Sequence, residues 1–483
     1  MKLLLSLLAV TFLCSGWEIF QNQFLGGDFE TRNETGYGVG AFTVGASAVA
    51  TLQEGALCLK LKPGKTSAQP FTILRCKQFP GGTHYLVKAK IRGKGKVSFG
   101  FACQFDLEGC GKKEGLWKQS IMLSQEWNHI SYDFDFSTIP LDRPLFLVRL
   151  LTEGTELFID DLEILAKWDD AIKISASPGT LLVPQGETLP EQTYNVYPLN
   201  AKGQFLWSDT FRESRVFPAE TIAGKACFTL PEPPKPGLHR LILTIGGFSL
   251  PKDVLVLSQN EISSLKNAAA KSSLKGNVLV LGDSLSDYSR GHNWVDIIQG
   301  LLGEKVRFYN LACGGDHCPK LAQRLTSKRA YYRDEMYEDI WSRKYDNVII
   351  FVGQNDTVSF EKDKYAKPQV AIGNVKSSFK TIIDEISKHT NAPITIFSGI
   401  STPQEINDKN KATFHYRFGI PAFVEDYNRT VKQICAERGL SYLDIYTPFS
   451  ALENKASYFR PDGVHLSTAG HLHLSKIVLE QMK

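Results

Sequence analysis

The spacing of hydrophobic positions separates the chain into regions of different periodicity. Over residues 17–167, apolar and polar residues alternate in short runs bounded by Gly- and Pro-rich turns. These runs are residues 56–61, 85–91, 97–103 and 127–136. A period of two is typical of strands that bury one face. This region is therefore predicted to be an all-β sandwich.

A second β-rich region covers residues 168–258. Residues 194–197, 226–230 and 238–245 have the composition of strands, and the Pro-rich stretch 231–237 is typical of an edge loop. The pattern predicts a small immunoglobulin-like sandwich. No chemically suggestive group of residues occurs in it, so we expect it to act as a spacer or as a wall beside another domain.

The pattern changes again after residues 259–275, a polar stretch rich in Ala, Lys and Ser that we interpret as a linker. From residue 276 to residue 483, short apolar runs alternate with amphipathic segments. The predicted strands are residues 277–281, 306–311, 347–352, 394–399 and 441–444, and the predicted helices are residues 294–302, 374–388, 422–438 and 469–482. This alternation indicates an α/β domain whose parallel sheet is covered on both faces.

Residues 1–16 have the organisation of a signal peptide. Lys2 precedes an apolar run over residues 3–13, and the small residues Cys14, Ser15 and Gly16 follow it. The run is too short to span a bilayer, and no other stretch reaches the length of a transmembrane helix. We therefore expect a secreted or periplasmic protein without a transmembrane segment. Lipid attachment at Cys14 stays open as an alternative.

Charge and cysteine content indicate which partners, disulfides and cofactors to expect. A net charge of +4 over 483 residues gives no basic region that would favour a nucleic-acid partner. Export permits disulfides among the nine cysteines, and the pairs Cys103/Cys110 and Cys313/Cys318 are close enough in sequence to form them. Buried free thiols are the favoured interpretation. Neither CxxC nor HExxH occurs, so no metal and no other cofactor is expected.

Residues that suggest chemistry gather in four short blocks of the C-terminal half. The first block is residues 278–286, in which an apolar run ends at Gly282 and Ser284 follows at the expected start of a helix. The second block is residues 310–316, the third is residues 351–356 after another apolar run, and the fourth is residues 461–466. In open α/β sheets, ligands bind beyond the carboxyl ends of the strands. Blocks that follow strands are therefore placed where a ligand would bind.

Together the four blocks resemble those of the GDSL/SGNH hydrolase family, in the same order and at similar spacing, over residues 276–483. The resemblance implies a flavodoxin-like fold and a carboxylic ester hydrolase with Ser284 as nucleophile, His465 as base and Asp462 as the group that orients the base. It also implies an oxyanion hole formed by the N–H groups of Ser284 and Gly315 and by the side chain of Asn355. A shift from Gly315 to its neighbour Gly314 stays open.

The chemistry explains why these residue types are needed. A serine hydroxyl becomes a good nucleophile only when a base takes its proton. The tetrahedral intermediate needs hydrogen-bond donors for its oxyanion. The second Gly of a GxSxG elbow is absent, which argues against an α/β-hydrolase.

Other polar residues near the blocks receive structural interpretations. Asp283 and Asp356 are expected to bond backbone groups around the site. His471 and His473, on the last predicted helix, are interpreted as surface or packing residues rather than metal ligands. For His292 and His317, pocket lining and packing stay equally open.

The N-terminal region carries a second, less specific resemblance. Residues 26–30 and 157–164 resemble the first and last strands of carbohydrate-binding jelly rolls. In that family the two ends often hold calcium, for which Asp28, Glu30 and Asp161 are candidates, although ordinary solvated acids are favoured. Tyr37, Trp117 and Trp127 are candidates for stacking on sugar rings. Of these, Trp117 is the strongest and Trp127 is expected in the core.

The resulting hypothesis is a secreted serine esterase that acts on an acyl ester, with O-acetyl groups on a carbohydrate as the favoured substrate. An acylated small molecule or polysaccharide is therefore the expected partner. A lipase or thioesterase and a catalytically inert glycan-binding protein remain the alternatives. Residues 401–423 are expected to form a long loop that folds over the site and helps to select the substrate.

Overall fold

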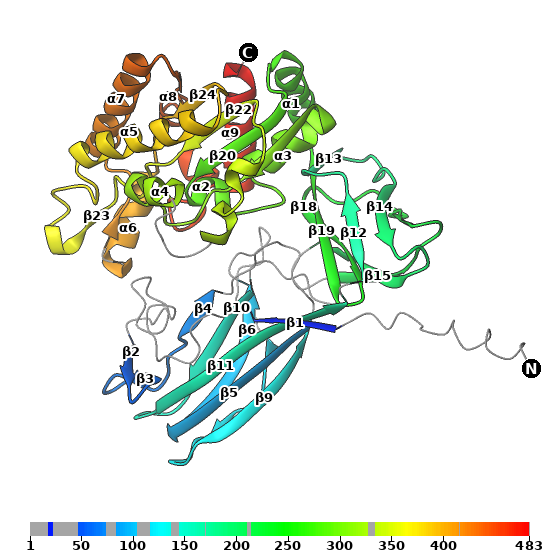
Figure 1. The fold of residues 1–483 in the computed structure, drawn as a ribbon, viewed down its shortest axis with the longest axis vertical. Coiled ribbons are helices and arrows are strands. Elements are labelled where there is room, and N and C mark those ends of the chain that lie inside the picture. The colour runs from blue at the N-terminus through cyan, green and yellow to red at the C-terminus, as the bar shows by residue number, and fades with distance from the viewer. Residues whose placement is uncertain are drawn as a thin grey trace, which may run out of the picture. The chain divides into compact units, whose positions relative to one another are not determined.

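The computed structural model describes residues 18–22, 47–73, 84–103, 116–136, 144–169, 171–209, 214–326, 334–414 and 416–482 (Figure 1). The expected signal peptide, Asp28, Glu30 and Tyr37 lie outside these residues. Contacts divide the chain into two units. The first comprises Met1–Ala176, Pro190–Thr229 and Arg240–Pro251, and the second comprises Ser177–Leu189, Leu230–His239 and Lys252–Lys483. Within the described ranges, no helix combines the length and the apolar character needed to cross a membrane.

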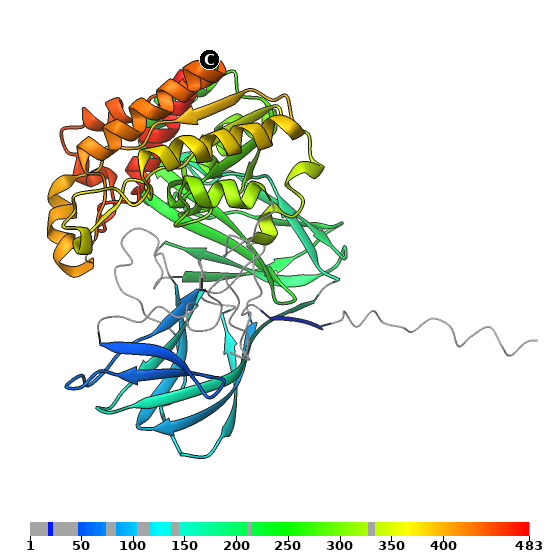
Figure 2. The ribbon, with the colours of Figure 1, turned by 60° about the vertical axis from the view of Figure 1, so that its left-hand side comes forward.

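The N-terminal part of the first unit is a β-sandwich (Figure 2). One sheet has the order β2-β3-β11-β5-β9, with β1 paired to β11, and the other has the order β4-β10-β6-β7, with β8 paired to β6. The strands are β1 Glu18–Asn22, β2 Ala48–Gln53, β3 Ala56–Leu61, β4 Phe71–Ile73, β5 His84–Lys94, β6 Lys96–Cys103, β7 Leu116–Trp117, β8 Ile121–Met122, β9 Asn128–Asp135, β10 Pro144–Leu150 and β11 Glu156–Asp169. Alternate residues of facing strands, such as Val87, Phe99 and Phe146, fill the core. The predicted sandwich is confirmed.

The following region is also all-β. Its strands are β12 Lys173–Ala176, β13 Leu181–Pro184, β14 Gln192–Tyr197, β15 Lys202–Ser208, β16 Ser214–Glu220, β17 Lys225–Phe228, β18 Gly237–Ile245 and β19 Phe248–Leu257. They form sheets with the orders β12-β14-β17 and β13-β19-β18-β15-β16. The second all-β region is therefore confirmed. The unit boundary runs through it and not at residue 258, because β13 and the end of β19 belong to the second unit.

The C-terminal region contains the predicted parallel sheet, with the order β21-β20-β22-β24-β26. Its strands are β20 Gly276–Gly282, β21 Val306–Asn310, β22 Asn347–Phe351, β24 Ile394–Phe397 and β26 Ser441–Leu443, and a separate pair is formed by β23 Ser359–Phe360 and β25 Tyr416–Arg417. The helices are α1 Gln259–Lys271, α2 Ser284–Asp287, α3 Trp294–Leu302, α4 Cys318–Leu325, α5 Ile372–His389, α6 Gln404–Phe414, α7 Pro421–Arg438, α8 Tyr446–Ser450 and α9 Thr468–Gln481.

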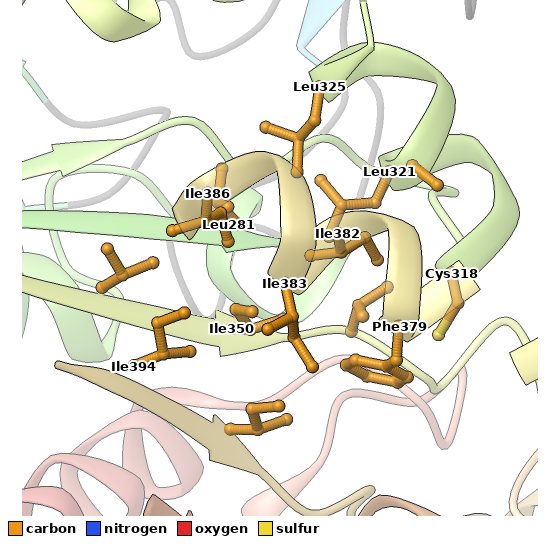
Figure 3. Close-up of a cluster of buried hydrophobic side chains, with 14 of the residues drawn as sticks. Leu281, Cys318, Leu321, Leu325, Ile350, Phe379, Ile382, Ile383, Ile386 and Ile394 are labelled. Carbon is orange, nitrogen blue, oxygen red and sulfur yellow. The ribbon is translucent and has the colours of Figure 1, made fainter. Parts of the chain in front are cut away.

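Both faces of this sheet are buried, which explains the continuous apolar runs of its strands. Leu279 and Leu281 of β20 join a cluster with α4, α5 and α7, and Val278 and Val280 join a cluster with α1, α3 and α9. Figure 3 shows the first cluster, in which Phe379 and the isoleucines of α5 lie over the strand residues. The predicted α/β fold is confirmed.

Residues 259–275 are not the expected linker. Most of them form α1, which begins with a capping box between Ser258 and Glu261. Its buried face consists of Ile262, Leu265, Ala268 and Ala269, and the helix packs on α9. The C-terminal fold therefore begins before residue 276. Alanine makes the buried face less hydrophobic than leucine would, which explains why the pattern suggested a linker.

The connection between β12 and β13 packs closely on α3 within the second unit. Thr180 N donates to Asp296 O at 2.8 Å, and Thr180 Oγ1 donates to Gly291 O at 2.6 Å. A Cβ on Gly179 would collide with the backbone of Gly300, and a Cβ on Gly300 would collide with Thr180 O. Two glycines thus permit this approach of one backbone to another.

Candidate active site

The first block places Ser284 at the carboxyl end of β20, as the first residue of α2. Asp283, rather than Ser284, is the N-cap of this helix. Its Oδ1 accepts from Leu285 N at 3.0 Å, and its Oδ2 accepts from Gln354 N at 3.3 Å in the third block. Burial raises the pKa of Asp283 to about 7. Asp283 therefore joins two blocks through backbone hydrogen bonds, in agreement with its structural interpretation.

The second block forms a tight turn after β21, closed by a hydrogen bond from Asp316 N to Cys313 O at 3.1 Å. Gly314 N donates to Asp287 Oδ2 at 2.9 Å, so this N–H group is already occupied. Gly315 has φ +81°, is exposed, and its N–H has no protein acceptor among the described residues. This difference favours Gly315 over Gly314 as a donor to an oxyanion. Asp316 forms a buried bidentate pair with Arg324, which holds the turn.

The third block follows β22 and lies against the second. Asn355 Nδ2 donates to Asp316 O at 2.8 Å, which uses one of its two amide hydrogens. The Asp356 carboxylate accepts from Cys318 N at 3.1 Å. Burial raises the pKa of Asp356 to about 6. Asn355 is therefore fixed beside the Gly315 turn, and Asp356 binds backbone as expected.

The fourth block contains a hydrogen-bonded histidine–aspartate pair. His465 Nδ1 lies 2.7 Å from Asp462 Oδ2, and Asp462 Oδ1 accepts from Val464 N and His465 N at 2.9 Å each. The intervening Gly463 has φ +73°. Burial would raise the pKa of the Asp462 carboxyl, but its hydrogen bond to His465, the charge of that histidine and the two N–H groups hold the pKa below its ordinary value. A carboxylate that stays ionised can orient an imidazole through Nδ1.

Two contacts connect the loop of the fourth block with the residues that follow the first block. The Tyr288 ring, one turn after Ser284, lies with its centroid 4.4 Å from that of the His465 ring. Arg460 Nη2 donates to Ser289 Oγ at 3.0 Å. The structure thus brings all five predicted site residues into one connected group of loops, and the roles given to them stay predictions.

The segment over residues 401–423 is more ordered than the expected loop, because it contains α6 and β25. Asn407 Nδ2 donates to Gly463 O at 3.1 Å, and Asn410 Nδ2 donates to Pro461 O at 2.9 Å. Burial raises the pKa of Tyr416, with a further contribution from the charge of Asp462. The segment therefore packs on the fourth block, while its role in substrate selection stays a prediction.

Residues 280–472 match the model of the GDSL-like lipase/acylhydrolase family. The C-terminal region therefore contains a GDSL-like lipase/acylhydrolase domain. The resemblance of the four blocks is thereby confirmed, and so is the expectation of a serine ester hydrolase with an acylated substrate.

Solved structures include several with likeness to parts of the chain. A lipase/acylhydrolase from Enterococcus faecalis is 18% identical over 42% of this chain and 93% of its own, with a TM-score of 0.33. An active-site mutant of a family two carbohydrate esterase from Clostridium thermocellum is 10% identical over 91% and 96%, with a TM-score of 0.29. A CBM4 structure is 12% identical over 29% and 97%, with a TM-score of 0.22. No curated protein matches the chain. At TM-scores below 0.5, none of these likenesses identifies the substrate.

Beside the GDSL-like site lies a second histidine–aspartate pair that the sequence did not indicate. His292 Nδ1 is 2.6 Å from Asp253 Oδ2, and both side chains are buried. Asp253 comes from β19 and His292 from the loop between α2 and α3, so no short motif contains both residues. Tyr288 was missed for a different reason, because nothing in the sequence predicted its contact with His465.

Three further histidines and two cysteines of the C-terminal region pack against protein atoms. His317 is the N-cap of α4, and burial lowers its pKa to about 4. His471 is buried and His473 is half-buried on α9, and no group of three or more metal-ligating side chains occurs among the described residues. Cys313 and Cys318 are buried free thiols, so the disulfide considered between them is not formed. Cys110 lies outside the described residues.

In the N-terminal sandwich, the surroundings of Trp117 and Trp127 differ from those expected for these two candidates. The guanidinium of Arg149 lies 3.5 Å from the Trp117 ring centroid, and a Cβ on Gly100 would lie 2.6 Å from the same ring. Trp117 is therefore packed by protein atoms and is a poor candidate for sugar stacking. Trp127 is 38% exposed and precedes β9, so it is not the core residue that was expected. Asp161, a former calcium candidate, pairs with Lys90.

Proposed function

We propose that the protein hydrolyses an acyl ester through a covalent acyl-enzyme, with Ser284 as nucleophile, His465 as general base and Asp462 as its orienting partner. The observation that carries this proposal is the 2.7 Å hydrogen bond between His465 Nδ1 and Asp462 Oδ2. Because the carboxylate accepts the proton of Nδ1, the neutral imidazole has its lone pair at Nε2, as a general base requires.

In the first half of the reaction, Ser284 Oγ attacks the ester carbonyl while its proton moves to His465 Nε2. The tetrahedral intermediate collapses, the C–O bond to the alcohol breaks, and the imidazolium returns the proton to the leaving oxygen. In the second half, water gives its proton to His465 and attacks the acyl group, which releases the acid and restores Ser284.

The oxyanion would be bound by three donors: Ser284 N, Gly315 N and Asn355 Nδ2. Gly315 N has no acceptor among the described residues, and Asn355 retains one amide hydrogen after bonding Asp316 O at 2.8 Å. Removing one such donor typically slows catalysis by about 10²–10³-fold. The same hydrogen bond to Asp316 fixes the orientation of the amide before substrate binds.

The substrate we propose is a carbohydrate that carries O-acetyl groups. An N-terminal β-sandwich with a likeness to carbohydrate-binding jelly rolls accompanies the hydrolase domain, and such a combination suits an ester that is attached to a glycan. We also propose export of the protein through residues 1–16, with release or lipid attachment at Cys14 as the two outcomes.

Hydrolysis of p-nitrophenyl acetate by wild type, Ser284→Ala and His465→Ala tests the catalytic assignment. Activity in wild type alone supports it, and activity of Ser284→Ala within tenfold of wild type contradicts it. Absence of turnover in wild type favours the inert glycan-binding alternative. Acetate release from a panel of acetylated polysaccharides then tests the substrate, while faster turnover of long-chain esters or thioesters would favour a lipase or thioesterase. N-terminal sequencing of the exported protein tests cleavage before Trp17.

A further inference from the structure

Tyr288 is attached directly to the helix that carries Ser284. It is the C-cap of α2, and its N–H donates to the backbone oxygen of Ser284 at 2.9 Å. Asn293 Nδ2 donates to Tyr288 O at 3.2 Å. The backbone position of Tyr288 is therefore fixed relative to the proposed nucleophile.

The ring of Tyr288 lies between two parts of the proposed site. Its centroid is 4.4 Å from that of His465, with 37° between the ring planes. At Gly314, an added Cβ would lie 2.7 Å from Tyr288 Cε1 and 3.1 Å from its hydroxyl oxygen. Gly314 does not have a positive φ, so its backbone conformation does not require glycine. Position 314 requires glycine because the Tyr288 ring occupies the space that a side chain would fill.

The next residue is held in an unusual conformation by the loop of His465. Ser289 has φ +58°, is buried, and accepts a hydrogen bond from Arg460 Nη2 at 3.0 Å. Arg460 N in turn donates to His465 O at 2.8 Å. A left-handed backbone conformation is strained for a non-glycine residue and persists only where its surroundings hold it. The turn that presents Tyr288 is therefore held in place by the loop of the proposed base.

We propose that Tyr288 is a positioning residue that holds the imidazole of His465 at the distance and angle required by Ser284. The inference rests on the proposed function of Ser284 and His465. Asp462 Oδ2 holds the imidazole at Nδ1, on one edge of the ring. Tyr288 places a flat aromatic surface 4.4 Å from the ring centroid of His465, and its own backbone is bonded to the Ser284 helix, so it limits tilting of the imidazole.

The first test compares Tyr288→Leu with Tyr288→Phe. Because a misplacement of about 1 Å can cost about 10²-fold in rate, we expect Tyr288→Leu to lower kcat on p-nitrophenyl acetate by about 10–100-fold with little change in KM. Tyr288→Phe should retain kcat within about threefold, since it keeps the aromatic surface. A raised KM with unchanged kcat would instead make Tyr288 a substrate contact, and equal losses in both variants would show that the ring surface is not the cause. Either result overturns the proposal.

The second test is a double-mutant cycle with Gly314→Ala. Its methyl group should displace the Tyr288 ring and lower kcat, although the N–H of residue 314 can still bond Asp287. In the Tyr288→Leu background the same methyl group has more room, so its further effect should be small. Additive effects of the two substitutions would contradict a common action through the ring.

Trp341→Leu provides the matched control, because the Trp341 ring stacks on His389 at 4.6 Å, outside the four blocks. Its kcat should equal that of wild type, and urea unfolding would verify that all variants are folded. Failure of the proposed function is recognised separately. If Ser284→Ala keeps its activity, the nucleophile assignment fails, whereas an inactive Ser284→Ala beside a fully active Tyr288→Leu refutes only the positioning role.

Discussion

Among its described residues, the second unit has two histidine–aspartate pairs with nearly equal separations and very different surroundings. The His465–Asp462 distance is 2.7 Å and the His292–Asp253 distance is 2.6 Å. Side-chain exposure is 20% for His465 and 37% for Asp462, but 2% for His292 and 1% for Asp253. Only the first pair can meet a substrate, so the hydrogen bond by itself does not distinguish a reactive pair from a structural one.

The two pairs also arise differently from the chain. Asp462 and His465 are three residues apart on a turn at Gly463. Two backbone N–H groups of the same turn donate to the second carboxylate oxygen of Asp462. Asp253 and His292 are 39 residues apart and join β19 to the loop after α2. A local pair can be recognised as a motif, whereas the distant pair depends on the fold being complete. The comparison predicts that substitutions at the first pair affect rate and that substitutions at the second affect stability.

The largest effect is expected at the exposed pair. His465→Ala should lower kcat on p-nitrophenyl acetate by about 10⁴-fold or more, as should Ser284→Ala, because triad members act as a unit. The urea midpoint of His465→Ala should remain close to that of wild type, since the side chain contributes to chemistry rather than to the core. An equal loss of activity per folded molecule in His292→Ala would remove the distinction between the pairs.

Asp462→Asn is expected to have a slightly smaller effect. The amide can keep the contact with His465 but favours the wrong tautomer, and a comparable change in a serine protease triad lowers kcat by about 10⁴-fold. Because the pKa of Asp462 is lowered in the folded protein, its carboxylate stabilises the fold at pH values above the ordinary pKa of an aspartate. This contribution is lost as the pH falls through the lowered pKa of the folded protein. Asp462→Asn should not show this acid-dependent loss of stability. Urea unfolding at several pH values below neutrality measures it.

For the buried pair, the expected change is in stability. Removing one partner of a buried pair costs about 3–5 kcal/mol, so Asp253→Ala should lower the free energy of unfolding by this amount. Activity per folded molecule should fall far less than in Asp462→Asn. Chemical unfolding combined with titration of active sites by a fluorophosphonate would separate the two quantities. A variant with wild-type stability would show that the buried pair contributes little.

The smallest effect is expected at Asp283, a buried carboxylate bonded to backbone groups rather than to a histidine. Its pKa of about 7 in the folded protein lies above the ordinary value, so the unfolded chain loses this proton first as the pH rises. Stability should therefore decline as the pH rises from about 4 to about 7. Asp283→Asn should flatten this dependence in urea unfolding. Asp356 also has a raised pKa, of about 6, so the stability of Asp283→Asn should still decline somewhat as the pH rises.

A helix or strand could be predicted from the sequence where its buried face is strongly hydrophobic. The run Val278-Leu279-Val280-Leu281 identified β20 because both faces of the sheet bury it. By contrast, α1 was taken for a linker because Ala268 and Ala269 make its buried face weakly hydrophobic. The polar sequence of α6 concealed a helix in the same way.

Side-chain surroundings were less predictable than elements. The fourth block identified His465 and Asp462 because three residues of sequence carry both groups. Asp253 and His292 share no local pattern, and only the folded backbone brings them together. The expectations for Trp117 and Trp127 failed because Trp117 packs on Gly100 of another strand, whereas Trp127 precedes β9 and is exposed.

The close approach at Gly179 and Gly300 has a consequence for the evolution of this architecture. A Cβ at either glycine would collide with backbone atoms, and backbone atoms cannot be exchanged by mutation. A change at one position therefore has no compensating change at the other. Among homologues that keep strands β12–β19, both positions should remain glycine. In relatives that consist of the hydrolase domain alone, other residues should be accepted at position 300. The residue at this position would therefore indicate whether an ancestor of the protein had strands β12–β19.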